Sequence, residues 1–154
     1  MLAPGDKAPA FKAKDQNGNV VSLADFKGKK VVVYFYPEDD TPTCTEQACN
    51  LRDNYSLLKK RGFAIVGISP DDVKSHKKFE AKFTLPFPLL ADPDKKIIEA
   101  YGTWGEKQMF GHHYMGVFRH TYIIDEKGNI ERIFRKVFSK KHTQQILDSY
   151  DKKK

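Results

Sequence analysis

Residues 30–44, KVVVYFYPEDDTPTC, carry the pattern on which the fold of this 154-residue chain depends. After Lys30, the residues up to Tyr36 form a continuous run of β-branched and aromatic side chains. A strand that is apolar on both faces belongs in the middle of a covered sheet. Pro37 ends this run, and a short polar loop leads to Cys44. The stretch therefore predicts a central strand, a loop and the beginning of a helix.

A helix is expected over residues 43–61. Its apolar stripe has spacings of four and three residues and consists of Cys44, Ala48, Leu51, Tyr55 and Leu58. Thr43 and Glu46 fit a capping box with Thr43 as the N-cap, which puts Cys44 at the first helical position. The free N–H groups and the dipole of a helix start favour an anion, so they would stabilise a thiolate there. An inert core thiol fits the same stripe, and position alone leaves both interpretations open.

The remaining pattern is that of an α/β protein. Turn residues predict two hairpins, one around Asn17-Gly18 with strands at 11–15 and 19–22, the other with strands at 120–125 and 130–138. The other expected elements are a buried strand at 63–69, helices at 71–83 and 93–101 separated by a Pro-rich stretch at 85–91, and a final helix with Ile146, Leu147 and Tyr150 on one face. This order fits a thioredoxin-like fold with a central mixed β-sheet flanked by helices. We expect a single domain over residues 1–154.

The composition is that of a globular protein, with 40% hydrophobic and 12% aromatic residues. No apolar run approaches the roughly 20 residues that a bilayer span requires. Residues 1–10 lack the apolar segment of a secretory signal, and two cysteines are too few for a disulfide-stapled secreted fold. We therefore expect a cytoplasmic protein whose thiols stay reduced unless catalysis oxidises them.

The formal net charge of +7 raises the alternative of an anionic partner, such as nucleic acid or a membrane surface. Much of the excess lies late in the chain, at Arg132, Arg135, Lys136, Lys140, Lys141 and Lys152–Lys154. No nucleic-acid-binding motif accompanies these residues, so a solvated surface is the preferred interpretation. We expect neither a specific nucleic acid nor a membrane as a partner.

Residues 37–44 read Pro-x-x-x-Thr-x-x-Cys, with Pro37, Thr41 and Cys44 at the defined positions. This pattern resembles the active-site motif of the peroxiredoxins. It is most similar to the bacterioferritin-comigratory or Q-type branch, whose second cysteine lies five residues after the first, as Cys49 does here. The resemblance extends over nearly the whole chain, through the segments 5–11, 48–53, 104–107 and 119–125. Two departures are Thr43, where the branch often has Gly, and the less similar segment 110–118.

The resemblance implies a thiol peroxidase without a metal or organic cofactor, which reduces hydrogen peroxide and small organic hydroperoxides. Cys44 would be the peroxidatic nucleophile, a role that requires a thiolate and stabilisation of the departing oxygen. Arg119 would place a permanent cation beside that thiolate and hold the peroxide. Thr41 would hydrogen-bond the peroxide and the sulfur, and Pro37 would shape the pocket. Gln47 would orient the Arg119 guanidinium.

Cys49 would be the resolving residue, whose thiol condenses with the Cys44 sulfenic acid to form an intramolecular disulfide. Five residues along a regular helix separate two Cα atoms by roughly 8.7 Å, whereas a disulfide spans at most about 6.8 Å. The helix would therefore have to unwind around both cysteines in each cycle. Thioredoxin or a similar dithiol donor would reopen the disulfide. Members of this branch are often monomers, and we expect a monomer here; a bystander role for Cys49 is the alternative.

Two other functional classes compete with this interpretation. A thioredoxin-like disulfide reductase normally needs Cys-x-x-Cys, whereas four residues lie between Cys44 and Cys49. A zinc-binding module would need both cysteines together with His112, His113 or His120. The cysteine spacing is slightly long for zinc, no second pair exists, and residues 112–113 look like a polar loop. His76 and His142 lie on helical segments with no chemical neighbours, so we expect both at the surface.

Overall fold

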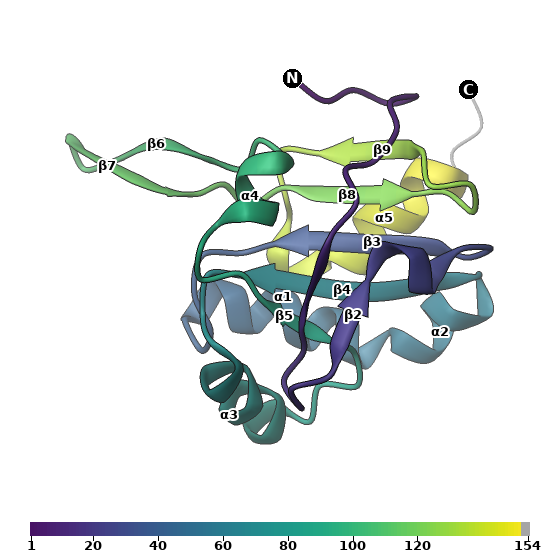
Figure 1. The fold of residues 1–154 in the computed structure, drawn as a ribbon, viewed down its shortest axis with the longest axis horizontal. Coiled ribbons are helices and arrows are strands. Elements are labelled where there is room, and N and C mark those ends of the chain that lie inside the picture. The colour runs from purple at the N-terminus through teal and green to yellow at the C-terminus, as the bar shows by residue number, and fades with distance from the viewer. Residues whose placement is uncertain (152–154) are drawn as a thin grey trace.

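The computed structural model describes residues 1–151, and the basic tail Lys152–Lys154 lies outside them. Its centre is a five-stranded sheet with the strand order β5-β4-β3-β8-β9 (Figure 1). These strands are β3 (Lys30–Phe35), β4 (Phe63–Ser69), β5 (Leu89–Ala91), β8 (Thr121–Ile124) and β9 (Ile130–Phe134). Strand β3 pairs in parallel with β4 and antiparallel with β8, so it occupies the middle of the sheet. The predicted mixed sheet with a central apolar strand is confirmed.

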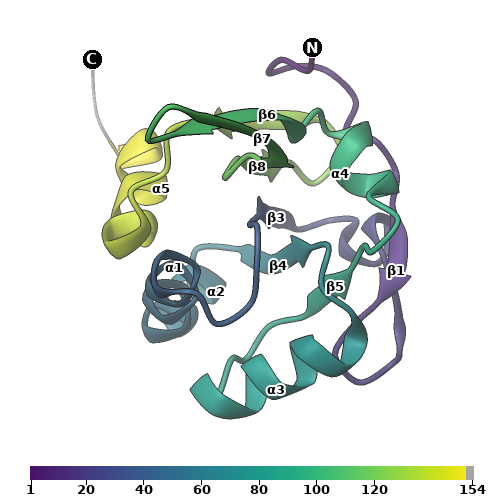
Figure 2. The same ribbon diagram turned by 90° about the vertical axis from the view of Figure 1, so that its left-hand side faces the viewer.

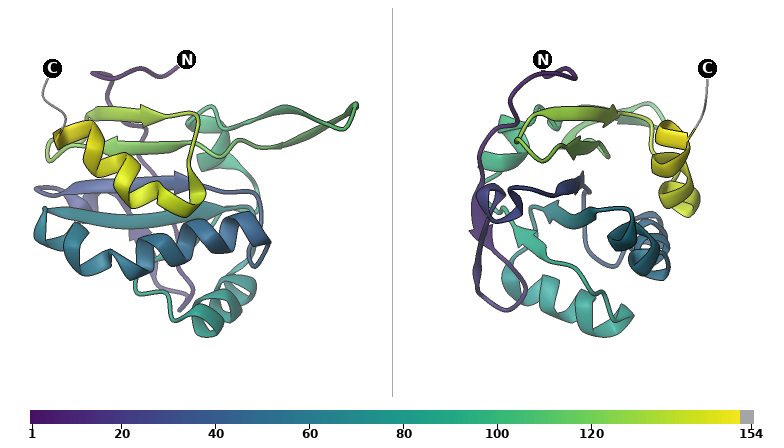
Figure 3. Two further views of the ribbon diagram at one scale, coloured as in Figure 1. Left: turned by 180° about the vertical axis from the view of Figure 1, so that it is seen from behind. Right: turned by 90° about the vertical axis from the view of Figure 1, so that its right-hand side faces the viewer.

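Side chains that alternate along β3 divide the core into two clusters. Tyr34 belongs to the cluster on one face of the sheet and Phe35 to the cluster on the other. The first face is covered by α1 (Pro42–Asp53), α2 (Tyr55–Lys60) and α5 (His142–Asp151), with α3 (Val73–Phe83) beside β5 at the edge (Figures 2 and 3). The second face is covered by the N-terminal hairpin of β1 (Lys12–Lys14) and β2 (Val20–Ser22) and by α4 (Lys96–Ala100). Short 3-10 helices lie at Leu23–Phe26 and Ser139–Lys141. Both faces are therefore buried, as the apolar run of β3 requires.

The helix that carries Cys44 begins earlier than predicted. Thr41, with an extended backbone (φ −89°, ψ 155°), is the N-cap, and Pro42 is the first helical residue. The predicted Thr43 N-cap with its Glu46 capping box is therefore wrong. A residue that precedes proline avoids the helical conformation, and proline fits the first position because no helical carbonyl would accept an N–H there. Cys44 consequently occupies the third helical position instead of the first.

The predicted helix over residues 43–61 is divided in two at Asn54. The backbone there leaves the helical region (φ −111°, ψ 14°), and the side chain donates to the Asn50 carbonyl (2.8 Å). Helix α2 then continues the buried stripe through Leu58. Gly62 follows with φ of 86°, a left-handed conformation that suits glycine after a helix.

Two strand regions are absent from the sequence prediction. Strand β5 lies within the stretch 85–91, where its three residues pair with β4. Strands β6 (Trp104–Met109) and β7 (His112–Val117) form a hairpin that extends away from the sheet (Figure 1). The prediction of a loop at residues 112–113 is wrong, since both histidines belong to β7. The helix expected at 93–101 spans only Lys96–Ala100, because Lys95 is left-handed (φ 62°).

The expectation that His76 and His142 lie at the surface is wrong, because both residues are fully buried. His76 Nδ1 lies 2.7 Å from Asp39 Oδ2, and its Nε2 lies 3.0 Å from the Leu90 carbonyl. His142 Nε2 lies 2.9 Å from Thr121 Oγ1. A helical pattern cannot reveal such partners, because they come from distant parts of the chain.

Several late basic residues have structural contacts. The Arg135 guanidinium donates to the Leu2 carbonyl (2.8 Å), and the Arg132 guanidinium lies 4.5 Å from the centre of the Tyr150 ring. Such contacts give part of the late positive charge a role that needs no anionic partner. Within residues 1–151, no helix has the length and apolar character needed to cross a bilayer.

Stability should fall in acid because of His142. Gln145 Oε1 accepts from Nδ1 (3.0 Å) and Thr121 donates to Nε2, so the ring is neutral. Burial lowers the pKa of His142 to about 4, although the Gln145 acceptor partly opposes this shift. An unfolded histidine has a pKa near 6.5. The neutral ring of His142 therefore contributes up to about 3 kcal/mol to the free energy of unfolding above about pH 6.5, and this contribution is lost as the pH falls toward 4.

Urea unfolding of the wild type and His142→Gln from about pH 7 to about pH 4 checks this prediction. The variant should be less stable at neutral pH but should lose less stability on acidification. His112→Gln, at an exposed position of β7, is the matched control and should follow the wild type. If the free energy of unfolding depended on pH in the same way for the wild type and for His142→Gln, His142 would not be the cause of the acid destabilisation.

Candidate active site

Cys44 lies in the first turn of α1, just after the loop that follows β3, and it is 2% exposed. The first backbone hydrogen bond of the helix joins the Thr45 N–H to the Thr41 carbonyl (2.8 Å). The N–H groups of Thr43 and Cys44 therefore have no partner within the helix, and Pro42 has no N–H at all. This positive end of the helix favours a negative charge on the sulfur.

Arg119, between β7 and β8, supplies a full positive charge at the same sulfur. Its Nη2 donates to Cys44 Sγ at 3.1 Å, and its Nη1 donates to Gln47 Oε1 at 2.9 Å. Gln47 is fully buried one turn beyond Cys44, so its oxygen holds the guanidinium in place. The structure thus brings together all three residues that the sequence analysis predicts to interact. A guanidinium hydrogen-bonded to sulfur stabilises the thiolate over the thiol.

Lys107 of β6 is a second cation near this site, and the sequence analysis assigns it no role. Burial lowers the pKa of Lys107, the positive charge of Arg119 lowers it further, and the negative charge of Cys44 opposes both effects. Its Nζ donates to the Val117 carbonyl across the base of the β6–β7 hairpin (2.9 Å). The match at residues 104–107 is the sequence signal that could have indicated this residue.

Thr41 and Pro37 border the loop that precedes Cys44. Pro37 is half-buried just beyond the end of β3. Thr41 is also half-buried, and its hydroxyl donates to the Glu38 carbonyl (3.1 Å), which leaves the oxygen lone pairs available as acceptors. The expected contacts of Thr41 and Pro37 with a bound peroxide stay predictions.

Cys49 lies on α1 together with Cys44, and both thiols are free. Burial raises the pKa of Cys49; the Arg52 cation acts in the opposite direction, and the Asp53 carboxylate adds to the rise. In this state Cys49 is thus a weaker nucleophile than an ordinary exposed thiol. Because α1 is continuous through both cysteines, the separation expected for a regular helix applies to them.

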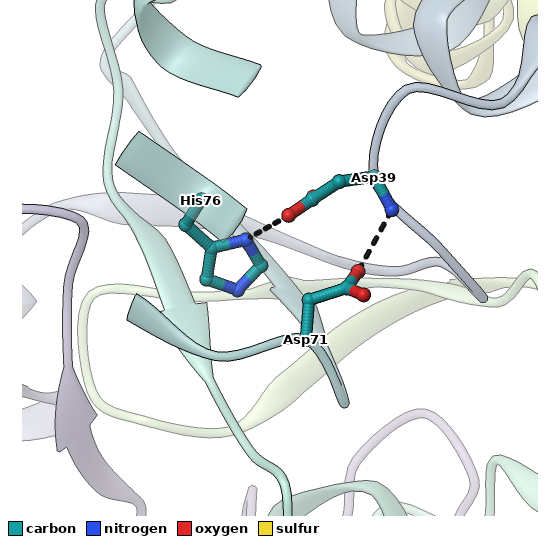
Figure 4. A group of neighbouring side chains, drawn as sticks. All are labelled: Asp39, Asp71 and His76. Atoms are coloured by element: carbon teal, nitrogen blue, oxygen red, sulfur yellow. Dashed lines mark hydrogen bonds and ion pairs between the residues drawn. The ribbon is translucent and has the colours of Figure 1, made fainter. Parts of the chain in front are cut away.

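The zinc-site alternative receives no support from the geometry. Among the described residues, one group of three potential metal ligands comes together, Asp39, Asp71 and His76, and it contains neither cysteine (Figure 4). His113 lies instead on the hairpin, where its Nδ1 is 2.7 Å from Glu106 Oε1.

Comparison with known proteins places this geometry in a family. The model of the AhpC/TSA family matches residues 4–133. The putative peroxiredoxin bcp of Coxiella burnetii is 46% identical over 143 residues, which cover 93% of this chain and 95% of the relative. The peroxiredoxin Bcp of Escherichia coli K12 is 44% identical over 147 residues, which cover 96% of this chain and 94% of the relative.

Solved structures agree with the sequence relatives. A Xylella fastidiosa PrxQ mutant has a TM-score of 0.90 at 26% identity, over 97% of this chain and 96% of that one. The bacterioferritin comigratory protein of Xanthomonas campestris, studied for its alkyl peroxide reduction activity, has a TM-score of 0.84 at 32% identity, over 90% of this chain and 88% of that one. These neighbours confirm the predicted thioredoxin-like fold. The chain therefore belongs to the AhpC/TSA family and, within it, to the Bcp or PrxQ peroxiredoxins.

Proposed function

We propose that Cys44 is the peroxidatic cysteine and Cys49 the resolving cysteine of this thiol peroxidase. The observation that carries the proposal is the 3.1 Å contact between Arg119 Nη2 and Cys44 Sγ. Only a thiolate attacks a peroxide at a useful rate, and the guanidinium and the helix start both favour that form. Membership of the family implies a hydroperoxide substrate and a thiol reductant.

In the first step, the Cys44 thiolate attacks one peroxide oxygen. An S–O bond forms as the O–O bond breaks, and the electron pair of that bond leaves with the departing oxygen, which takes a proton to become water or an alcohol. The sulfur loses two electrons and becomes a sulfenic acid. Arg119 and Lys107 would stabilise the negative charge on the departing oxygen. Thr41 would hold the peroxide in line with the sulfur, and Pro37 would limit access by water.

In the second step, the Cys49 thiolate attacks the Cys44 sulfur, and the S–O bond breaks to release hydroxide, which becomes water. In a regular helix, the two Cα atoms are separated by roughly 8.7 Å, too far for a disulfide. The first turns of α1 would therefore unwind before the S–S bond forms. Unwinding would also move Cys49 into water, which removes the burial that raises the pKa of this thiol.

In the third step, two thiols of an external reductant are oxidised while the Cys44–Cys49 disulfide is reduced. We propose thioredoxin or a similar dithiol protein as this reductant, and a monomeric single-domain enzyme acting without a metal or organic cofactor. A chain with only two cysteines suits a reducing compartment better than a disulfide-stapled secreted fold does, which supports the proposed cytoplasmic location.

Substitution of the two cysteines should separate the steps. Cys44→Ser should abolish peroxide turnover, because no other thiol contacts Arg119 among the described residues. Cys49→Ser should still consume one equivalent of peroxide and then accumulate a sulfenic acid that dimedone traps, as mass spectrometry would show. A Cys49→Ser protein that forms no dimedone adduct after oxidation would argue against Cys49 as the resolving residue.

Arg119→Met should slow the oxidation of Cys44 by about 100- to 1000-fold, because it removes the cation at the sulfur and at the departing oxygen. The rate of thiol loss with hydrogen peroxide, measured in a stopped-flow instrument, checks this. Arg61→Met is the matched control, since Arg61 forms an exposed ion pair with Asp151 at the far end of α2. Equal rates for Arg119→Met and the control would remove the main support for the site.

Formation of the disulfide should reduce the helix content of the protein, because the segment between the cysteines lies in α1. Far-ultraviolet circular dichroism should therefore show less helix after one equivalent of peroxide than before it, and dithiothreitol should restore the signal. The Cys49→Ser protein, which cannot form the disulfide, should show no such loss. Identical spectra of the reduced and the disulfide form would contradict the unwinding step.

A further inference from the structure

A buried contact between a histidine and a carboxyl group lies next to the segment that carries the cysteines. Asp39 belongs to the catalytic loop, which we define as residues 36–41 between β3 and α1, and its side chain is 5% exposed. His76 lies on α3 and its side chain is fully buried. Figure 4 shows the imidazole pointing at the Asp39 carboxylate, with Nδ1 and Oδ2 2.7 Å apart. Neither residue takes part in the chemistry proposed above.

The hydrogen-bond partners of this pair favour one arrangement of its protons. The Leu90 carbonyl can only accept, so His76 Nε2, at 3.0 Å, must donate to it. A neutral ring would then present a bare Nδ1 to the carboxylate, so the short contact requires one more proton. The Tyr36 hydroxyl donates to Asp39 Oδ1 (2.6 Å) and the Ser75 hydroxyl donates to Oδ2 (2.7 Å). Two donors at Asp39 favour a carboxylate, which leaves the proton on an imidazolium.

These contacts fix the loop just before it turns toward the helix. Besides its side-chain partners, Asp39 donates its backbone N–H to Asp71 Oδ2 (2.7 Å), as Figure 4 also shows. The next residue, Asp40, has a left-handed backbone (φ 59°), which is unfavourable for a residue other than glycine. Thr41 then forms the N-cap of α1. The hydrogen bonds of Asp39 therefore fix the residue that immediately precedes the strained turn into the helix.

We propose that His76 and Asp39 are positioning residues. The hydrogen bond that they form through a shared proton, which we call the latch, fixes the catalytic loop and keeps the first turn of α1 helical for the reaction with peroxide. This proposal rests on the proposed function, because the turn that the latch controls carries Cys44 and leads to Cys49. With the latch closed, Cys44 keeps its contact with Arg119. With the latch open, the turn unwinds more readily, which favours disulfide formation over the reaction with peroxide.

Because the latch contains a proton, the rate of Cys44 oxidation should depend on the state of the latch as well as on the thiol itself. The groups that face His76 are Asp39 and Tyr36 from the catalytic loop, Asp71 after β4, the Leu90 carbonyl of β5 and Ser75 of α3. Burial raises the pKa of Tyr36 well above its usual value, so this hydroxyl keeps its proton. Burial also raises the pKa of Asp71, although the hydrogen bond from the Ser69 hydroxyl acts in the opposite direction. Loss of the shared proton in alkali would then leave Nδ1 against a carboxylate and open the latch.

The test measures the oxidation of Cys44 and the formation of the disulfide separately. The rate of Cys44 oxidation by hydrogen peroxide is measured in a Cys49→Ser background from about pH 5 to about pH 10. The rate of disulfide formation is measured in the two-cysteine protein after a pulse of peroxide. Each measurement is made on the parent protein, on His76→Leu, on Asp39→Asn and on Lys82→Gln. The last variant is the matched control, because it removes an exposed ion pair between α3 and Asp40 of the same loop.

The parent rate of oxidation should fall in alkali as the latch opens. His76→Leu should oxidise about 10- to 100-fold more slowly at neutral pH, as expected when a reacting group loses its position, yet form the disulfide faster. Asp39→Asn can donate its amide to a neutral imidazole, so the alkaline fall should disappear. Lys82→Gln should match the parent in both steps.

An alkaline fall that persists in Asp39→Asn would overturn the proposal, as would a His76→Leu protein that slows both steps together. Asp39→Asn keeps the size of the side chain and decides the question even where His76→Leu does not fold. A parent protein that reacts with peroxide no faster than free cysteine would contradict the proposed function instead, which keeps the two failures distinguishable.

Discussion

The contact between the Arg119 guanidinium and the Cys44 sulfur joins residues that are 75 positions apart in the chain. The central sheet makes this contact possible. Strand β8 runs antiparallel to β3, with Thr121 opposite Tyr34, and the Phe35 N–H donates to the His120 carbonyl (2.9 Å). The end of β3, which leads to Cys44, therefore lies beside the start of β8, which follows Arg119. The apolar residues of β3 thus help to form this contact as well as the core, because they fix where the guanidinium and the sulfur meet.

The start of α1 combines burial with a small number of stabilising bonds. Thr41 makes no side-chain capping bond, and Pro42 contributes no N–H. A helix whose N-cap lacks a side-chain bond is less stable than a fully capped one, typically by about 1 kcal/mol. The N–H groups that have no partner within the helix would therefore favour the thiolate and also allow this turn to unwind at low cost. One local feature would serve both the attack on peroxide and the formation of the disulfide.

The parts of the structure that follow local rules could be predicted from the sequence. The apolar run of β3 and the stripe of α1 indicated the fold correctly, whereas the role of Cys44 as the reacting residue stays a prediction from the motif between Pro37 and Cys44. The N-cap was misplaced because Thr43 and Glu46 match a capping box, whereas the conformational restriction that Pro42 imposes on Thr41 decides the helix start. The β6–β7 hairpin and the partners of His76 depend on contacts between distant segments, and a single sequence contains no pattern that reveals them.

Two sets of contacts would limit how much of α1 can unwind. At one end, Asp39 is held by His76 and by the Asp71 carboxylate. At the other end, the Asn50 side chain donates to the Lys140 carbonyl (2.9 Å) and accepts from the Thr143 N–H (2.8 Å), which ties α1 to α5. Both cysteines lie between these two sets of contacts. Cys44 is almost fully buried, so a protein reductant cannot reach its sulfur while the helix is wound. Unwinding confined to this segment would withdraw Cys44 and Ala48 from one core cluster but would leave the central sheet paired. It would also expose the disulfide to the reductant, so the same motion would serve resolution and recycling.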